Sequence, residues 1–178
     1  MRIITGKARG KKLVTLEGKD VRPTSDKIKE SLFNILQFNI EGRTFLDLFA
    51  GSGQIGLEAI SRGAEKAVFV DSSKKSIAVI EENVKNTGFT AESKVVNADS
   101  LMYIRHCPET FDVAFIDPPY RTGILQEVLP YVAEAMNEGG IIVCEHPADE
   151  AVPEELGEFK KLKDYKYGKI ILTSYRRD

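Results

Sequence analysis

An acid, two prolines and an aromatic residue follow an apolar run in the middle of the chain. Residues 111–116 read F-D-V-A-F-I, and D-P-P-Y follows at once as Asp117 to Tyr120. Each proline fixes its own φ and disfavours a helical conformation of the residue before it. Asp117, Pro118 and Pro119 are therefore predicted to form a stiff, extended segment at the end of a buried strand. Such a segment would hold a carboxylate, a free carbonyl and the Tyr120 ring in fixed positions.

A glycine-rich loop forms a second candidate site. The sequence D-L-F-A-G-S-G-Q-I-G runs from Asp47 to Gly56, between an apolar run and a helical pattern. Glycines let the backbone turn tightly and approach a ligand at the N-terminus of the following helix. An acid about twenty residues on, where Asp71 stands, is placed to hydrogen-bond a ribose. We expect an adenosine-containing cofactor here, contacted by Phe49, Gly51, Gly53, Asp71 and Ser72.

The acids near this loop bear on which cofactor binds. Asp47 is poorly suited to the pyrophosphate of a dinucleotide, but it suits the ammonium and sulfonium groups of S-adenosylmethionine. Asp99 and Ser100 follow the third apolar run, where an acid could accept a hydrogen bond from the adenine amino group. Two simpler interpretations remain open: Asp47 as a turn acid at a strand end, and Asp99 as the N-cap of the next helix. We expect S-adenosylmethionine, bound in part by Asp47, Asp99 and Ser100.

The elements that position these motifs alternate along the chain. Apolar runs typical of strands occupy residues 44–49, 67–70, 94–97, 113–116 and 141–144. Helical patterns lie between them, at residues 54–62, 73–86, 100–106 and 122–137. Strands alternating with helices are typical of βαβ units, in which a parallel sheet is covered on both faces. Ligands bind at the carboxyl ends of such strands, so D-P-P-Y is expected beside the cofactor.

The two ends of the chain depart from this alternation. Residues 159–165 and 169–175 alternate around a Tyr-Gly pair and predict an antiparallel hairpin at one sheet edge. A helix is expected at residues 27–36. We therefore predict one α/β domain with a mostly parallel, seven-stranded sheet. Within it, residues 1–40 form a basic N-terminal extension and helix, and residues 41–178 form the core.

Composition limits the class of protein. With 178 residues, 42% of them hydrophobic, the chain can bury one ordinary core. No apolar stretch approaches the ~20 residues that span a bilayer, and no signal-peptide h-region is present, so we expect a cytoplasmic protein. Cys107 and Cys144 fit neither a disulfide framework nor a metal pair, and His106 and His146 lie far apart. We expect no metal, no membrane contact and a monomer.

Charge is distributed unevenly along the chain. The net charge is −2, but the first 30 residues hold nine Lys or Arg against four acids, which gives +5 there and −7 for the remainder. The nine are Arg2, Lys7, Arg9, Lys11, Lys12, Lys19, Arg22, Lys27 and Lys29. Such asymmetry indicates an anionic partner at one end of the molecule, although a solvated basic surface would give the same pattern.

The motif D-P-P-Y after the fourth strand resembles that of the Rossmann-like amino-methyltransferases. The resemblance implies a Rossmann-like methyltransferase fold and a target that is a planar NH2 group. It implies that Asp117 and the carbonyl of Pro118 each accept one N–H, and that Tyr120 stacks on the substrate ring, so these three residues are the predicted catalytic residues. A stacked base contributes about 1–3 kcal/mol, and orientation for in-line transfer contributes about 7–11 kcal/mol.

A wider resemblance covers nearly the whole chain. Residues 2–13 (R-I-I-T-G-K-A-R-G-K-K-L), 22–26 (R-P-T-S-D) and 167–169 (Y-G-K), with D-L-F-A-G-S-G, resemble the RsmD family. This resemblance implies methylation of the exocyclic N2 of one guanine in 16S rRNA, so 16S rRNA or the small ribosomal subunit is the expected partner. The predicted RNA-binding residues are Arg2, Lys7, Arg9, Lys11, Lys12 and Arg22. They would bind RNA phosphates and would not recognise a particular base sequence.

Other functions remain compatible with parts of the pattern. D-P-P-Y specifies an NH2 group and not its carrier, so an N6-adenine or a protein-glutamine methyltransferase is the first alternative. A nicotinamide-dependent oxidoreductase could use the same glycine loop, and a non-catalytic RNA-binding factor could keep the fold. The four acids Asp47, Asp71, Asp99 and Asp117 disfavour the last, because a protein without catalysis has no need to keep them together.

Overall fold

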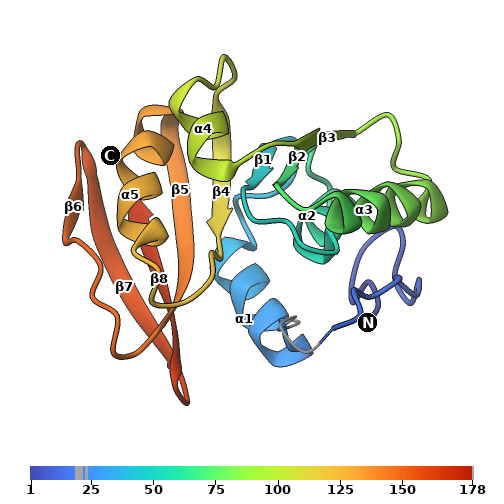
Figure 1. The fold of residues 1–178 in the computed structure, drawn as a ribbon, viewed down its shortest axis with the longest axis horizontal. Helices are drawn as coiled ribbons and strands as arrows, with labels where there is room; N and C mark the ends of the chain where they lie inside the picture. The colour runs from blue at the N-terminus through green and yellow to red at the C-terminus, as the bar shows by residue number, and fades with distance from the viewer. Residues whose placement is uncertain (19–21, 23, 178) are drawn as a thin grey trace.

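One mixed β-sheet dominates the computed structural model, which describes residues 1–18, 22 and 24–177 (Figure 1). Its strands are β1 (Thr44–Asp47), β2 (Lys66–Asp71), β3 (Ser93–Asn97), β4 (Phe111–Ile116), β5 (Met136–Pro147), β6 (Glu155–Leu156), β7 (Phe159–Tyr167) and β8 (Ile170–Arg176). The helices are α1 (Asp26–Leu36), α2 (Gln54–Ser61), α3 (Lys74–Thr87), α4 (Ser100–Arg105) and α5 (Ile124–Glu134).

The strand order is β3-β2-β1-β4-β5-β8-β7-β6. The first five strands in this order are parallel, and β8, β7 and β6 each pair antiparallel with their neighbours. The predicted parallel sheet with an antiparallel hairpin at its edge is confirmed. The prediction of seven strands was one too few in the described part of the chain. The additional strand, β6, has two residues, too few to produce an alternating pattern.

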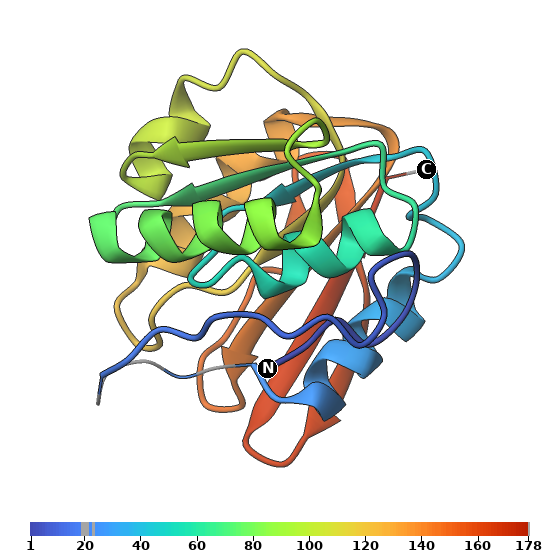
Figure 2. The same cartoon turned by 90° about the vertical axis from the view of Figure 1, so that its right-hand side faces the viewer.

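The helices cover both faces of the sheet, which explains why the parallel strands are apolar on both sides (Figures 1 and 2). Phe45 of β1 packs in the core beneath α1, α2 and α3. Its neighbour Leu46 points to the opposite face and packs with residues of α4 and α5. The two cores fix the sheet rigidly, so the strand ends are well-defined positions for functional groups.

The strand order reverses between β1 and β4, which lie side by side with β1 continuing to β2 and β4 to β5. In an open α/β sheet this switch point leaves a crevice outside the carboxyl ends of the strands. Asp47 is the last residue of β1, and Asp117 follows directly after the end of β4. The two acids therefore flank the crevice where a ligand is expected.

The start of the chain packs against α2 and α3 (Figure 2). Ile3 and Leu13 are buried in the core. The backbone N–H groups of Ile4 and Thr5 donate to the buried carboxylate of Glu58 in α2. Farther along, Val14 exchanges backbone hydrogen bonds with the side chain of Asn83 in α3. This part of the predicted extension is consequently held by the core rather than projecting from it.

The predicted boundary between α5 and β5 was wrong. We predicted a helix to residue 137 and a strand at 141–144, but α5 ends at Glu134 and β5 begins at Met136 and continues to Pro147. Residues 145–147 are in the strand because they pair with β8, which comes much later in the chain. Among the described helices, none has the length and apolar character needed to cross a membrane.

Candidate active site

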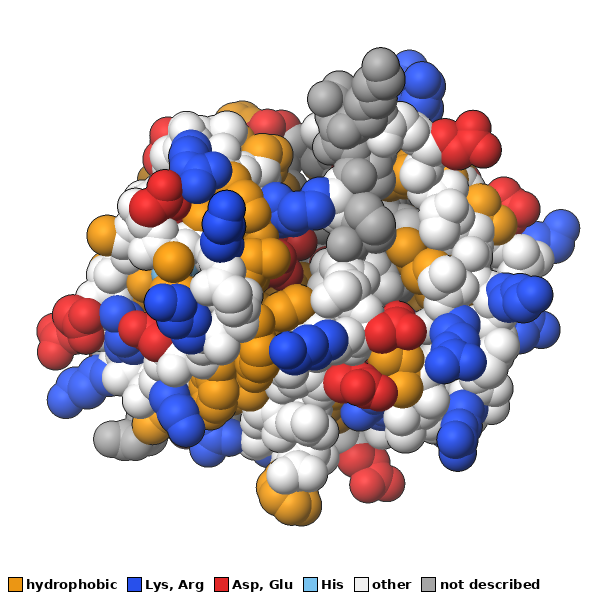
Figure 3. Space-filling model, turned by 90° about the horizontal axis from the view of Figure 1, so that it is seen from below, with side chains coloured by type: hydrophobic (Ala, Val, Ile, Leu, Met, Phe, Trp, Pro, Cys, Tyr) orange, Lys and Arg blue, Asp and Glu red, His pale blue; other side chains and the backbone are white. Residues whose placement is uncertain are grey.

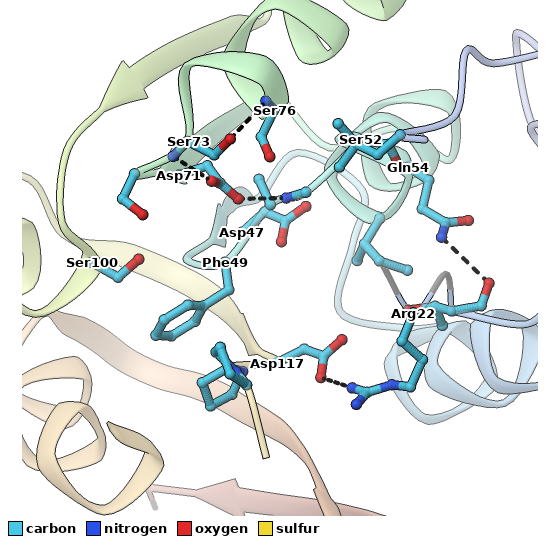
Figure 4. Close-up of a pocket in the computed structure, with 18 of the residues that line it drawn as sticks. Arg22, Asp47, Phe49, Ser52, Gln54, Asp71, Ser73, Ser76, Ser100 and Asp117 are labelled. Carbon is cyan, nitrogen blue, oxygen red and sulfur yellow. Dashed lines mark hydrogen bonds and ion pairs between the residues drawn. The ribbon is translucent and has the colours of Figure 1, made fainter. Parts of the chain in front are cut away.

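A cavity of about 880 Å³ lies at the carboxyl ends of the parallel strands (Figure 4). It is lined by the loop after β1, by the ends of β2 and β4, by residues 99–101 after β3, and by parts of the N-terminal segment. The predicted site residues that line it are Arg22, Asp47, Phe49, Gly51, Asp71, Ser72, Asp99, Ser100, Asp117 and Pro118. Residues from five separate stretches of sequence thus meet in one place.

The glycine loop fits tightly between β1 and α2. Gly53 is the N-cap of α2 with φ 81°, a left-handed conformation that favours glycine. At Gly56, a Cβ atom would lie 2.4 Å from a ring carbon of Phe69, so only glycine lets α2 pack this closely on β2. Gly53 thus shapes the start of α2 and is not among the described residues that line the cavity, whereas Gly51 lines it.

Asp71 ties this loop to the end of β2. Its Oδ2 accepts the N–H of Gly51 at 2.9 Å, and its Oδ1 accepts the N–H of Ser73 at 2.9 Å. Each carboxylate oxygen has room for about one further donor. The position is suited to two adjacent hydroxyls such as those of a ribose, and the contact of Asp71 with a ribose stays a prediction.

Asp47 is buried at the centre of the site (Figure 4), with 2% of its surface exposed. Its Oδ2 accepts the N–H of Gly56 at 3.1 Å. Burial raises the pKa of Asp47 to about 7, while the hydrogen bond from Gly56 acts in the opposite direction and the Asp71 carboxylate raises it further. A buried carboxylate of this kind would be stabilised by a cationic ligand group and not by an anion.

The charge of the cavity distinguishes between cofactor classes. Four carboxylates line it, those of Asp47, Asp71, Asp99 and Asp117. Among its described lining residues, Arg22 alone carries a cationic side chain, and that side chain is paired with Asp117. A pyrophosphate would be repelled by this surface. The residues fit S-adenosylmethionine, which carries an ammonium and a sulfonium and no phosphate.

Asp99 and Ser100 have structural contacts as well as places in the cavity. Asp99 is the N-cap of α4, and its Oδ1 accepts the N–H of Met102 at 3.0 Å. Ser100 Oγ donates to the carbonyl of Leu48 at 2.6 Å, which fixes α4 to the loop after β1. The capping interpretation of Asp99 is thus correct, and its contact with adenine stays a prediction.

At the other end of the cavity, Asp117, Pro118 and Pro119 line the wall together with Arg22, whereas Tyr120 is not among the described lining residues. The guanidinium Nη2 of Arg22 donates to Asp117 Oδ1 at 3.0 Å (Figure 4). The guanidinium carbon lies 3.4 Å from the centroid of the Tyr120 ring, so the group covers the ring that we expected to stack on substrate. Arg22, predicted to bind RNA, is therefore placed against the predicted catalytic residues.

Glu145 of β5 completes this cluster, and sequence analysis missed it. The hydroxyl of Tyr120 donates to Glu145 Oε1 at 2.7 Å, and Arg22 Nη2 lies 3.6 Å from the same oxygen. Burial and the nearby Glu145 carboxylate raise the pKa of Asp117 well above its usual range, against the opposing effect of Arg22. Burial also raises the pKa of Glu145. Asp117 and Glu145 therefore share one cation, the guanidinium of Arg22.

The other predicted RNA-binding residues lie on the surface of the N-terminal segment. Arg2, Lys7, Arg9, Lys11 and Lys12 are all exposed. Figure 3 shows Lys and Arg side chains spread over the face that surrounds a hollow in which acidic and apolar atoms lie. Lys29 is instead fully buried, and its Nζ donates to the carbonyl of Arg2 at 2.6 Å. Lys19, one of the nine basic residues, lies outside the described residues.

In the described part of the chain, no group of three or more His, Cys, Asp or Glu side chains is placed to hold a metal ion. His146 is buried, and its ring nitrogens contact the carbonyl of Pro147 at 3.0 Å and the hydroxyl of Thr173 at 2.7 Å. These contacts occupy both nitrogens within the sheet.

Comparison with known proteins places the chain in a family. The family model described as "Conserved hypothetical protein 95" matches residues 1–176. The chain belongs to this family. It is 30% identical over 182 residues to the "Ribosomal RNA small subunit methyltransferase D" of Escherichia coli (strain K12), covering 100% of this chain and 90% of that protein. The resemblance to the RsmD family is thereby confirmed.

A curated relative and a solved structure are similar to this chain over nearly its whole length. YlbH of Bacillus subtilis (strain 168) is 36% identical over 182 residues, covering 99% of both chains. The solved structure of yhhF from Escherichia coli has a TM-score of 0.91 with this chain at 28% identity, covering 100% of this chain and 98% of yhhF. The N-terminal segment and the C-terminal hairpin are thus part of the family fold, and the predicted Rossmann-like methyltransferase fold is confirmed.

Proposed function

We propose that this family member transfers a methyl group from S-adenosylmethionine to the exocyclic N2 of a guanine in small-subunit rRNA. The Escherichia coli relative is named a ribosomal RNA small subunit methyltransferase, which supports rRNA as the substrate. The guanine N2 position follows from the resemblance to the RsmD family. The observation that carries the proposal is the position of Asp117 and Pro118 across the switch point from Asp47, in the same cavity.

The amine end of the site is built by the chain's own residues. An exocyclic amine is a weak nucleophile because its lone pair is delocalised into the ring. Asp117 Oδ and the carbonyl of Pro118 accept its two N–H groups, which draws the nitrogen toward tetrahedral geometry and directs its lone pair into the cavity. The prolines hold both acceptors still, and this supports transfer through orientation, worth up to about 7–11 kcal/mol.

The cofactor end contributes binding and orientation. S-adenosylmethionine supplies an electrophilic methyl group on a sulfonium. Asp71 would bind the ribose hydroxyls and Asp47 would attract the cationic part, with Phe49 forming an apolar wall. After transfer, the nitrogen must lose one proton. The raised pKa of Asp117 makes its carboxylate a better proton acceptor than an exposed one.

Cationic side chains would bind the RNA backbone, and base flipping would bring the target base into the site. The exposed cations at Arg2, Lys7, Arg9, Lys11 and Lys12 would contact phosphates, so affinity should fall as salt rises. The target base must leave its stack to reach Asp117, at a cost of a few kcal/mol. A base in a loop is the preferred target, because an unpaired base costs least to extrude.

Mass mapping of rRNA tests the proposal. In cells that lack the gene, one N2-methylguanine of 16S rRNA should disappear, and the wild-type gene should restore it. A matched strain carrying Asp117→Ala should not restore it, whereas Glu138→Ala, an exposed acid on β5, should. Loss of a methyladenine instead would support the N6-adenine alternative. An unchanged rRNA map would contradict the proposal.

A further inference from the structure

Arg22 holds a planar nitrogen group between two acids. Its Nη2 lies 3.0 Å from Asp117 Oδ1 and 3.6 Å from Glu145 Oε1. The same guanidinium lies over the ring of Tyr120, with its carbon 3.4 Å from the ring centroid. The guanidinium is thus stacked on an aromatic face, and its Nη2 is directed at a carboxylate oxygen of each acid; Figure 4 shows the contact with Asp117.

One carboxylate oxygen of Glu145 has no hydrogen-bond donor among the described residues. Its side chain is 2% exposed, and Oε1 already accepts the Tyr120 hydroxyl at 2.7 Å. Oε2 is buried and has no hydrogen-bond partner among the described residues. A buried carboxylate oxygen without a donor is costly, so such an atom indicates a missing partner. A ligand with an N–H or O–H next to the donor that contacts Asp117 would supply this partner.

Guanine carries that donor pattern. Its N2 amine and its N1–H are adjacent donors joined through C2, so one can donate to Asp117 and the other to Glu145. Adenine differs at this edge, because N1 next to its N6 amine is an acceptor. A primary amide also differs, because a carbonyl oxygen stands beside its NH2. Two carboxylates side by side therefore match guanine and reject the other two carriers.

We propose that Glu145 determines specificity for guanine by accepting its N1–H while Asp117 accepts an N2–H. The base takes the place that the Arg22 guanidinium now occupies over Tyr120, so Arg22 must leave when the base enters. The Tyr120 hydroxyl keeps the Glu145 carboxylate oriented toward this place. This inference rests on the proposed guanine methylation and adds the residue that selects the base.

The test compares two bases at the methylated position of a short target RNA. Guanine has N1–H, whereas 2-aminopurine keeps the C2 amine but has a lone pair at N1. A site built for a donor rejects the analogue that lacks it, so the wild type should prefer guanine on the order of 100-fold or more in kcat/KM. A wild type that methylates both RNAs equally would overturn the inference without any variant.

The Glu145→Gln variant tests whether the base preference can be reversed. Its amide can donate to the N1 lone pair of 2-aminopurine, so methylation of guanine should fall and the preference should shift toward 2-aminopurine by about 10-fold or more. Glu138→Gln, on the same strand but exposed, should keep the wild-type preference. S-adenosylmethionine affinity, measured by calorimetry, should be unchanged in both variants.

The outcomes separate the two proposals. If Glu145→Gln loses activity equally on both RNAs, its role is structural and the inference is overturned. If the wild type methylates neither RNA at N2, the proposed function itself fails, and the specificity role of Glu145 fails with it. A shift in preference that only Glu145→Gln shows supports both.

Discussion

Arg22 covers the face of Tyr120 and is paired with Asp117, although 95 positions separate Arg22 from that acid. The contact brings the N-terminal segment to the amine end of the cavity. The Arg22 side chain is 43% exposed, compared with 14% for Asp117 and 2% for Glu145. Arg22 thus covers the residues that we expect to receive the target amine, and we expect it to move aside when the base enters.

Replacing Arg22 with Ala should destabilise the protein more at pH 8 than at pH 5. The variant leaves Asp117 and Glu145 without their cation. Because burial raises the pKa of both acids, protonation removes more of this uncompensated negative charge at pH 5 than at pH 8. We expect a loss of about 1 kcal/mol at pH 8, because the exposed side chain is screened by solvent. Urea unfolding at both pH values measures it, with exposed Lys27→Ala as control. Equal losses at both pH values would contradict this.

Tyr120 has two separable contributions. Tyr120→Phe keeps the ring and removes the hydroxyl that donates to Glu145, so we expect a loss of about 10-fold in kcat/KM for RNA. Tyr120→Ala also removes the stacking surface, which should cost a further 1–3 kcal/mol or about 5-fold to 150-fold. Steady-state kinetics on target RNA measure both losses. Equal activity of the two variants would show that the ring does not stack on the base.

Asp47 should make the cofactor-free protein less stable as pH rises. Its folded-state pKa of about 7 lies above the ordinary value of 3.8, so the folded protein keeps a proton that the unfolded chain has lost. The free energy of unfolding therefore falls between about pH 4 and pH 7 and then levels off. The loss is on the order of 4 kcal/mol.

Asp47→Asn removes this titration and keeps an acceptor for the Gly56 N–H. The variant should match the wild type near pH 4 and exceed its free energy of unfolding at pH 8. It should also bind S-adenosylmethionine more weakly, because the buried negative charge is gone. Urea unfolding across this pH range, without cofactor, checks the first point. A difference that does not change with pH would count against the assigned pKa.

Glu58 should control the attachment of the N-terminal segment. Its buried carboxylate accepts the N–H groups of Ile4 and Thr5 and pairs with Arg62 at 3.0 Å. Glu58→Ala leaves these donors unpaired, so a loss of about 3–5 kcal/mol is expected. Hydrogen exchange should speed up at Ile4 and Thr5, while exposed Glu65→Ala should change neither quantity. Unaltered protection at these amides would refute the attachment.

Local patterns were sufficient for much of the fold and site. Alternating apolar runs gave the order of strands and helices, and the rule for carboxyl ends then brought Asp47, Asp71, Asp99 and Asp117 to one cavity. These residues could be found because each lies at the end of a strand or within two residues after it. The glycine loop was recognisable for the same reason, since its strand, turn and helix are contiguous.

The missed features depend on contacts between distant parts of the chain. Glu145 is in a strand because β8 pairs with it, with Leu172 as its partner. A charged residue after an apolar run indicates a strand end, so spacing alone placed the boundary before it. Lys29 was counted among the basic residues that indicate an anionic partner. Its Nζ instead donates a hydrogen bond to the carbonyl of Arg2 inside the fold. No local pattern distinguishes these cases.

The central claim is that Asp117 receives the amine that is methylated. Single-turnover methylation of 16S rRNA by Asp117→Ala, together with calorimetric titration of S-adenosylmethionine, tests it most directly. We expect the methylation rate to fall by at least about 100-fold, as when one transition-state hydrogen-bond partner is lost, with cofactor affinity retained. Full methylation activity in this variant would contradict the account.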